Sequence, residues 1–255
     1  MKVIGVDVGG TFTDVFVMDE ATGQITTAKV PSTPGDQSQG FIDGIETAGV
    51  AFPDIATIVH GTTVGTNALL ERKGARTGII TTKGFRDVLE MRRRDRPTTW
   101  GLRGAFEPVV ARRDRVEVPE RVLADGTILE PVDPTHVEAQ ARALLSAGCE
   151  AVCIFFINGY ANAANEAKTV EAVRAIWPNP YVTAATEILP EIREFERLST
   201  ATLNAYLQPL VSSYVDKLQG GLTARGFGGD LLIVQSNGGV MSVSDTRSKP
   251  VRTAL

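Results

Sequence analysis

Residues 3–19, VIGVDVGGTFTDVFVMD, contain two apolar stretches separated by adjacent glycines and a run of hydroxyl side chains. The first stretch, residues 2–8, is apolar apart from Lys2 and Asp7 and predicts a buried strand. Residues 14–19, DVFVMD, predict a second strand, and residues 24–30, QITTAKV, alternate after a short turn. These three segments predict a three-strand antiparallel meander at the start of the chain.

The turn between the first two strands contains residue types that suit phosphate binding. Gly9 and Gly10 let the main chain approach an anion closely, and successive N–H groups in such a turn form an anion-binding nest. Thr11 and Thr13 add hydroxyl donors. We expect Asp7, at the tip of the first strand, to hold Mg²⁺ through water.

Asp14, on the other side of the turn, is expected to orient the hairpin or the metal shell. Two other phosphate motifs are excluded. The chain has no G-x-x-x-x-G-K-[ST] sequence, and a dinucleotide fingerprint needs a helix after its glycines, whereas the residues after Gly10 alternate as a strand. The alternative is a plain hairpin whose glycines only supply positive φ angles.

The rest of the chain alternates between helical and extended patterns from residue 55 onward, which predicts an α/β fold with a mixed sheet. Helices are expected at 36–50, 64–74, 84–91, 133–148, 162–178 and 189–222. Asp36 is the expected N-cap of the first, and Gly74 is expected to close the second. The segment 189–222 is expected to form one or two helices, with Pro209 near a join. Strands are expected at 57–63, 75–82, 149–159, 181–188 and 229–239. A hairpin is expected at 116–132, with its turn at Asp125 and Gly126, and a long loop at 92–115.

Composition excludes several classes of protein. The 255 residues carry a net charge of -4, which does not suit a nucleic-acid or anionic-membrane binder. No stretch approaches the roughly 18 apolar residues of a membrane span. Cys149 and Cys153 are too few for a disulfide framework, so we expect core packing and a cytoplasmic location. The final residues, KPVRTAL, suggest that the chain is part of something longer.

A second group of polar residues follows the strand expected at 57–63. One interpretation places His60, Thr62, Thr63 and Asn67 on a cleft wall near substrate or phosphate. The other is a turn whose threonine and asparagine side chains cap the next helix. His136, the other histidine, is expected at the surface.

Charged clusters give weaker signals. Arg94 lies in a run of arginines at 92–96 that suits an anionic substrate or partner, although a solvated loop with internal Asp–Arg pairs is favoured. Glu194, Glu196 and Arg197 are expected to form a buried ion-pair network at a helix start, with an architectural role.

The stretch DVGGTFTD at 7–14 resembles the first phosphate motif of the acetate kinase, sugar kinase, Hsp70 and actin superfamily, whose members clamp ATP between two related lobes. Longer segments at 60–91, 187–209 and 231–241 resemble the hydantoinase A and oxoprolinase family. Because several long segments agree in the right order, this resemblance is specific and runs along the whole chain.

The resemblance implies an actin-like ATPase lobe of the ribonuclease H-like type, with flanking helices. It implies a first domain at 1–195 and the truncated start of a hydantoinase A domain at 196–255. The implied activity is ATP- and magnesium-dependent opening of a cyclic amide. Asp7 and His60 would be catalytic, and the glycines and hydroxyls of the turn, with Asp14, would bind ATP.

The resemblance also implies a hydantoinase B-type partner subunit and allows a homo-oligomer. Three alternatives stay open at this stage. The first is the ATP-using subunit of an acetone- or acetophenone-type carboxylase. The second is a non-enzymatic nucleotide-binding module, and the third, which is less favoured, is a small-molecule kinase. The resemblance does not tell the amidohydrolase and the carboxylase apart.

Overall fold

The computed structural model describes residues 1–33, 36–93 and 106–254. Its contacts divide the chain into two compact units. Unit 1 contains Met1–Lys73 and Leu210–Leu255, and unit 2 contains Gly74–Pro209. These limits differ from the sequence domains 1–195 and 196–255, which stay a prediction.

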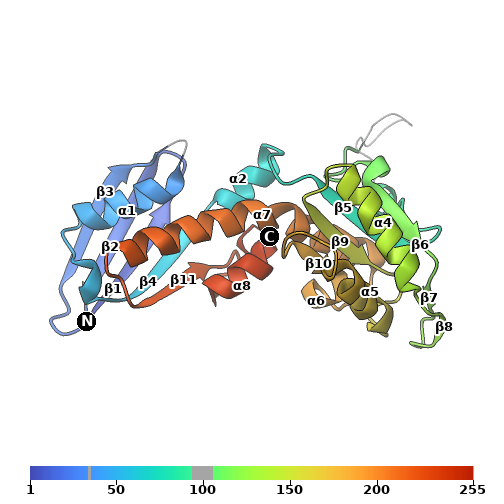
Figure 1. Cartoon of the computed structure of the whole chain (residues 1–255). Helices are drawn as coiled ribbons and strands as arrows, with labels where there is room; N and C mark the ends of the chain where they lie inside the picture. Colours follow the sequence, from blue (N-terminus) through green and yellow to red (C-terminus); the bar gives the residue numbers. More distant parts are fainter. Residues whose placement is uncertain (34–35, 94–105, 255) are drawn as a thin grey trace. The chain divides into compact units, whose positions relative to one another are not determined.

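Unit 1 is built on a six-stranded mixed sheet with the order β12-β11-β4-β1-β2-β3 (Figure 1). The first three strands are antiparallel neighbours, which confirms the meander predicted from the sequence. β4 then pairs in parallel with β1, and β11 in parallel with β4. The strands are β1 (Lys2–Val8), β2 (Phe12–Asp19), β3 (Ile25–Pro31), β4 (Ile55–Thr62), β11 (Asp230–Val234) and β12 (Val240–Ser242).

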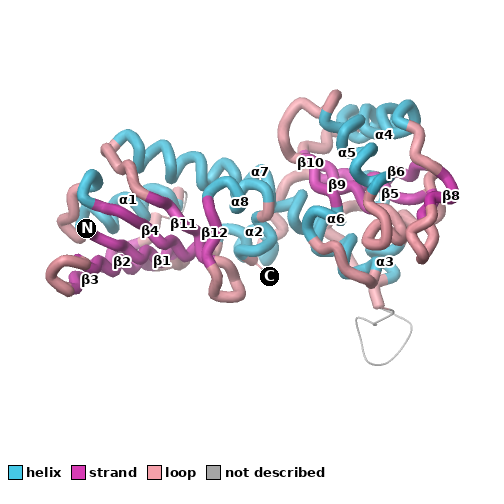
Figure 2. The backbone as a smooth tube through the Cα atoms, turned by 90° about the horizontal axis from the view of Figure 1, so that it is seen from below, coloured by secondary structure: helices cyan, strands magenta, loops and turns pink. Residues whose placement is uncertain are grey.

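One face of this sheet is covered by helices (Figure 2). Ile4, Val6 and Val8 of β1 point into a core that includes side chains of α1 (Gln37–Thr47) and of the second half of α7 (Glu194–Ala224). Asp36 caps α1, as predicted, by accepting a hydrogen bond from Ser38 N. The shorter elements of the unit are α2 (Val64–Leu70), α8 (Val243–Ser248) and the 3₁₀ turns Phe52–Asp54 and Pro250–Thr253.

Unit 2 contains a four-stranded, all-parallel sheet with the order β10-β9-β5-β6. Both of its faces are covered: α4 and α5 share one core with it, and the first half of α7 shares the other. The elements are β5 (Thr77–Thr82), α3 (Val88–Met91), a 3₁₀ turn (Arg112–Asp114), β6 (Arg115–Val118), β7 (Arg121–Val122), β8 (Ile128–Glu130), α4 (Pro134–Ser146), β9 (Ala151–Phe155), α5 (Ala164–Arg174), β10 (Val182–Ala184) and α6 (Ala185–Ile188).

The structure corrects two of the expected bounds and decides between one helix and two at 189–222. α2 ends at Leu70, and Gly74 is required instead by packing, because a Cβ there would lie 2.1 Å from the Tyr206 ring. The strand expected at 181–188 stops at Ala184 and continues as α6. α7 is one helix that passes through Pro209, since buried side chains on both sides of the proline hold it in place. Tertiary packing overrides local propensity at each of these points.

The network expected around Arg197 is present in unit 2. Arg197 is fully buried and donates to Glu166 Oε1 at 3.0 Å and to Glu194 Oε2 at 2.7 Å. Glu166 also accepts a hydrogen bond from Phe156 N at the end of β9. Burial raises the pKa of Glu166, and these donors oppose that shift. Glu196, in contrast, pairs with Arg93 at the surface.

Replacing Arg197 by methionine is expected to destabilise the protein by about 3–5 kcal/mol, because it leaves a buried carboxylate without its partner. Arg142→Met is the matched control. Arg142 faces Glu138 at 3.9 Å on the exposed side of α4, so its loss should cost no more than about 0.5 kcal/mol. Urea unfolding measures both, and equal losses would contradict the architectural role of Arg197.

Candidate functional site

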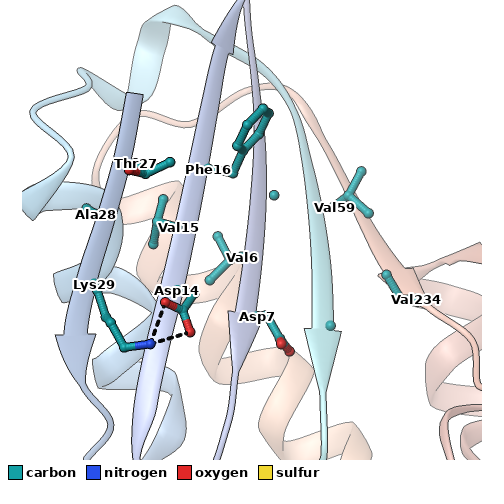
Figure 3. A pocket seen from close by; sticks show the side chains of 12 residues that line it. Val6, Asp7, Asp14, Val15, Phe16, Thr27, Ala28, Lys29, Val59 and Val234 are labelled. Carbon is teal, nitrogen blue, oxygen red and sulfur yellow. Dashed lines mark hydrogen bonds and ion pairs between the residues drawn. The ribbon is translucent and has the colours of Figure 1, made fainter. Parts of the chain in front are cut away.

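The candidate site lies at the carboxyl end of β1, on the sheet face opposite the α1–α7 core (Figure 3). Cross-strand register places Asp7 between Asp14 on β2 and Gly61 on β4. Gly61 makes room for the carboxylate, because a Cβ there would lie 3.0 Å from Asp7 Oδ1. A hollow of about 850 Å³ extends from these residues over Gly5.

The two carboxylates have different surroundings. Lys29 Nζ donates to Asp14 Oδ1 at 2.9 Å and to Oδ2 at 3.1 Å, so Asp14 is neutralised by its own neighbour on β3. Asp7 is exposed and forms no ion pair among the residues that the structure describes. Two in-register carboxylates repel each other, and a single lysine leaves one negative charge uncompensated. Asp7 is therefore the group that is free to receive a cation.

The Gly9–Thr11 turn lies directly beyond Asp7. Gly9 N donates to Phe12 O at 3.0 Å, and a Cβ on Gly9 would come within 3.1 Å of that carbonyl. Gly10 has neither a positive φ nor any atom within 4 Å of an added Cβ. The hairpin itself thus gives no reason for glycine at position 10, and the interpretation that the glycines supply positive φ is not supported. An approaching ligand would give such a reason.

The sheet separates the sequence-predicted residues into two groups. Thr13 is fully buried on the covered face, where its hydroxyl bonds Ser32 Oγ at 3.1 Å. Ser32 in turn donates to Gly9 O at 2.8 Å, while its N–H donates to Thr11 O. In this structure Thr13 supports the turn from beneath.

His60 also lies on the covered face and has no exposed surface. Burial lowers its pKa to about 4, so the ring is neutral near pH 7. Because the Val6 carbonyl can only accept, His60 Nδ1–H donates to it at 3.1 Å, and Nε2 accepts from the Tyr214 hydroxyl at 2.8 Å. His60 therefore joins α7 to the residue before Asp7, and its predicted catalytic role is not supported by this burial.

The residues after β4 form a helix entry. Thr62 Oγ1 accepts from Val64 N at 3.2 Å, and Asn67 Nδ2 donates to Thr63 Oγ1 at 3.3 Å. These contacts match the interpretation as a turn before a helix, although Thr63 itself makes no side-chain cap. Their predicted contact with substrate stays a prediction. Arg94 lies outside the described residues.

Three residues of the site were not singled out from the sequence. Lys29 neutralises Asp14, Ser32 supports the turn, and Tyr214 fixes the His60 ring. Alternation along β3 places Lys29 on the same face as Asp14, which is a signal that register reasoning can use. Nothing local in the sequence connects Ser32 or Tyr214 with the turn.

The surroundings suit a magnesium ion that a phosphate ligand brings with it. Among the described residues no three His, Cys, Asp or Glu side chains converge as a ready-made metal site. Mg²⁺ is commonly held by one or two carboxylates together with water and substrate phosphates. Asp7 beside the turn fits that pattern. Cys149 and Cys153 are buried, and burial raises their thiol pKa values to about 11 and 12, so core packing is their role.

The fold and the site define an α/β protein in which an aspartate lies at the carboxyl end of a central strand of a mixed sheet and a glycine turn follows that strand. The chain belongs to the hydantoinase/oxoprolinase family. Residues 3–177 match the model of the hydantoinase/oxoprolinase N-terminal region, and residues 197–255 match that of hydantoinase/oxoprolinase.

Individual relatives agree with this assignment. The chain is 38% identical to an uncharacterized protein of Methanocaldococcus jannaschii, over 97% of this chain and 37% of the relative. It is 31% identical to caprolactamase subunit alpha of Pseudomonas jessenii, over 93% of this chain and 36% of the relative. The solved nucleotide-free structure of acetone carboxylase, from work on ATP-dependent acetone carboxylation, superposes with a TM-score of 0.85 at 25% identity, covering 98% of this chain and 38% of that one. The chain thus spans little more than a third of each relative.

Stability is expected to fall as the pH drops from about 6.5 to about 4. The unfolded chain binds a proton at His60 in this window and the folded chain does not, so acid favours unfolding by up to about 3 kcal/mol. Urea unfolding at several pH values gives the free energy of unfolding as a function of pH for the wild type and for His60→Gln. The wild-type curve should fall more steeply between about pH 6.5 and about pH 4. His136→Gln, at the exposed histidine, is the control and should give the same curve as the wild type. A His60→Gln curve parallel to the wild-type curve would contradict the assignment of this pH dependence to His60.

Tyr214→Phe is expected to cost about 1–3 kcal/mol, because it leaves the buried His60 Nε2 without a donor. Tyr206→Phe on the same helix is the control, since no side-chain hydrogen bond of Tyr206 occurs in the described part of the chain. Thermal and urea unfolding report both variants. A Tyr214→Phe protein as stable as Tyr206→Phe would show that this hydrogen bond does not hold α7 on the sheet.

Proposed function

We propose that this chain is the first nucleotide-binding lobe of an ATP-dependent enzyme that opens a cyclic amide. The observation that carries the proposal is Gly10, a glycine for which the fold itself gives no reason, in the turn directly after Asp7. The N–H groups of Gly10 and Thr11 make no hydrogen bond within the described residues, so they are available to phosphate oxygens. Thr11 is exposed and adds a hydroxyl donor.

In this proposal the role of each residue depends on the face of the sheet on which it lies. Asp7 would hold Mg²⁺, and the ion would supply neutralisation of phosphate charge during transfer. The main chain of the turn cradles the phosphates, and Lys29 keeps the Asp14 carboxylate from competing for the metal ion. Thr13 and His60 act from the covered face by holding the turn and the end of β1 in place.

The chemistry follows from the inertness of an amide carbonyl. Transfer of the γ-phosphoryl group of ATP to the amide oxygen releases ADP and turns that oxygen into a leaving group. Water then attacks the carbon, and the C–N bond of the ring breaks as the nitrogen takes up a proton, which leaves an acyl phosphate. A second water hydrolyses the acyl phosphate to the carboxylate and free phosphate. The likeness to a caprolactamase subunit supports a cyclic amide as substrate. We propose a hydantoinase B-type subunit as the partner, since the caprolactamase relative is one subunit of an enzyme. A cytoplasmic location is also part of the proposal.

One other reaction has a specific observation in its favour. The likeness to acetone carboxylase supports ATP-dependent activation of a ketone for carboxylation. The same lobe would bind ATP in either reaction, so the substrate must be identified by assay.

The test uses the full-length protein, with its neighbouring subunit, and measures phosphate release from MgATP. Hydantoin, pyroglutamate, caprolactam, and acetone with bicarbonate are added separately. Stimulation by one cyclic amide, lost in Asp7→Ala, is the expected result. Stimulation by acetone with bicarbonate, and by none of the cyclic amides, would favour the carboxylase reaction instead. ATP binding without stimulation of phosphate release by any compound would favour a non-enzymatic nucleotide-binding module and contradict the proposed enzymatic activity.

Gly10→Ala separates ligand approach from folding. Because an added methyl group meets no protein atom, stability should change by less than about 1 kcal/mol, whereas the Kd for MgATP should rise roughly tenfold or more. Gly220→Ala, an equally open glycine in α7, should leave the Kd unchanged. Calorimetric titration and thermal unfolding report the two effects. An unchanged Kd in Gly10→Ala would remove the main support for the phosphate turn.

A further inference from the structure

The face of the six-stranded sheet that α1 and α7 leave open has side chains arranged in rows. Cross-strand register sets Met18 between Val3 and Ile25 in one row. The next row places Phe16 beside Gly5. Both rows are apolar at their centre.

A third row, nearer the turn, contains Gly61, Asp7, Asp14 and Lys29. The open face is thus divided into an apolar part, made by the first two rows, and a charged part that belongs to the candidate site. On the apolar part Phe16 is 43% exposed, Met18 36% and Ile25 57%. Large apolar side chains gathered on one face mark an interaction surface.

Helix packing leaves this face of the sheet open. Within the described residues the helices that pack on the sheet of unit 1 share a single core, whereas the parallel sheet of unit 2 contributes to one core on each side. A sheet with antiparallel strands can keep one face in solvent, so the exposed apolar side chains, and not strand direction, mark this face as an interaction surface.

The shape of the apolar part suits a helix. Gly5 in the second row has no side chain, and the part of the hollow of about 850 Å³ above it lies between Phe16 and Val59, its neighbours on β2 and β4. Figure 3 shows the Phe16 ring standing at the upper end of this hollow. Rows on one sheet face are about 7 Å apart, and an amphipathic helix about 10 Å across presents an apolar stripe of matching breadth.

We propose that an amphipathic α-helix from the full-length protein, outside residues 1–255, packs on the two apolar rows and leaves the charged row free. The lengths of the relatives support this occupant, because this chain matches only 37% and 36% of two of them. The inference goes beyond the proposed function and does not depend on ATP binding.

Methionine oxidation tests the proposal within one molecule. The chain has four methionines: Met1 is 78% exposed, Met91 62%, Met18 36% and Met241 5%. Full-length protein is treated with dilute hydrogen peroxide, and peptide mass spectrometry follows sulfoxide formation at each site. Exposure governs the rate, so a covering helix should slow Met18 to the rate of Met241, roughly tenfold below Met91.

Each other outcome overturns the proposal. Oxidation of Met18 at close to the Met91 rate would mean that the face is open to solvent. Protection that disappears on dilution would assign the face to a second copy of the chain. Protection that appears only when the neighbouring subunit is added would assign it to that partner.

A substitution pair gives an independent measurement on the full-length protein. Phe16→Ser removes the largest apolar side chain of the rows and should lower the Tm by about 2 °C or more if a helix packs on it. Leu129→Ser is the control, because Leu129 is 67% exposed on β8 in unit 2 and should leave the Tm unchanged. Equal Tm values for the two variants would overturn the proposal. Activity is not the readout, so a failed ATPase assay would leave this test intact.

Discussion

The double pairing of β1 is the constraint on which the candidate site depends. β1 is held antiparallel to β2 and parallel to β4 along its whole length, so its side chains have fixed neighbours on both sides. A shift of one residue would exchange the two faces of the strand and bring Asp7 into the apolar core. The apolar alternation of Ile4, Val6 and Val8 prevents that shift, because burying these side chains stabilises a single register.

This constraint gives the polar residues near the turn two different functions. On the open face, Asp7 is exposed and Asp14 is neutralised by Lys29. On the covered face, Thr13 and His60 are buried and fully engaged in hydrogen bonds. A buried polar group without a partner is costly, so the second set holds the strand ends firmly. The proposed reaction needs a charge-bearing group on a rigid support, and the two faces supply these separately.

Prediction from the sequence was reliable where the signal was local. The meander, the Asp36 cap and the Asp125–Gly126 turn follow from alternation, capping chemistry and turn preference, and the structure has all three. Prediction was less reliable where distant residues decide the outcome. The sequence left open whether Pro209 divides α7, and buried neighbours hold it as one helix. Gly74 was expected to close a helix, but it is required by a ring that lies 132 positions further along the chain, at Tyr206.

By itself the sequence determined the mixed α/β fold class and the glycine turn with its aspartate, because these depend on periodicity and on residues adjacent along the chain. The family followed from the resemblance of several long segments. Only the tertiary structure decided which polar residues share a face. Asp7, Asp14 and Lys29 lie together on the open face, where Lys29 pairs with Asp14. His60 lies on the covered face, where it is bonded to Tyr214, 154 positions away. The physical reason is that cross-strand register and helix packing bring distant side chains together, and a local pattern carries no information about such pairs.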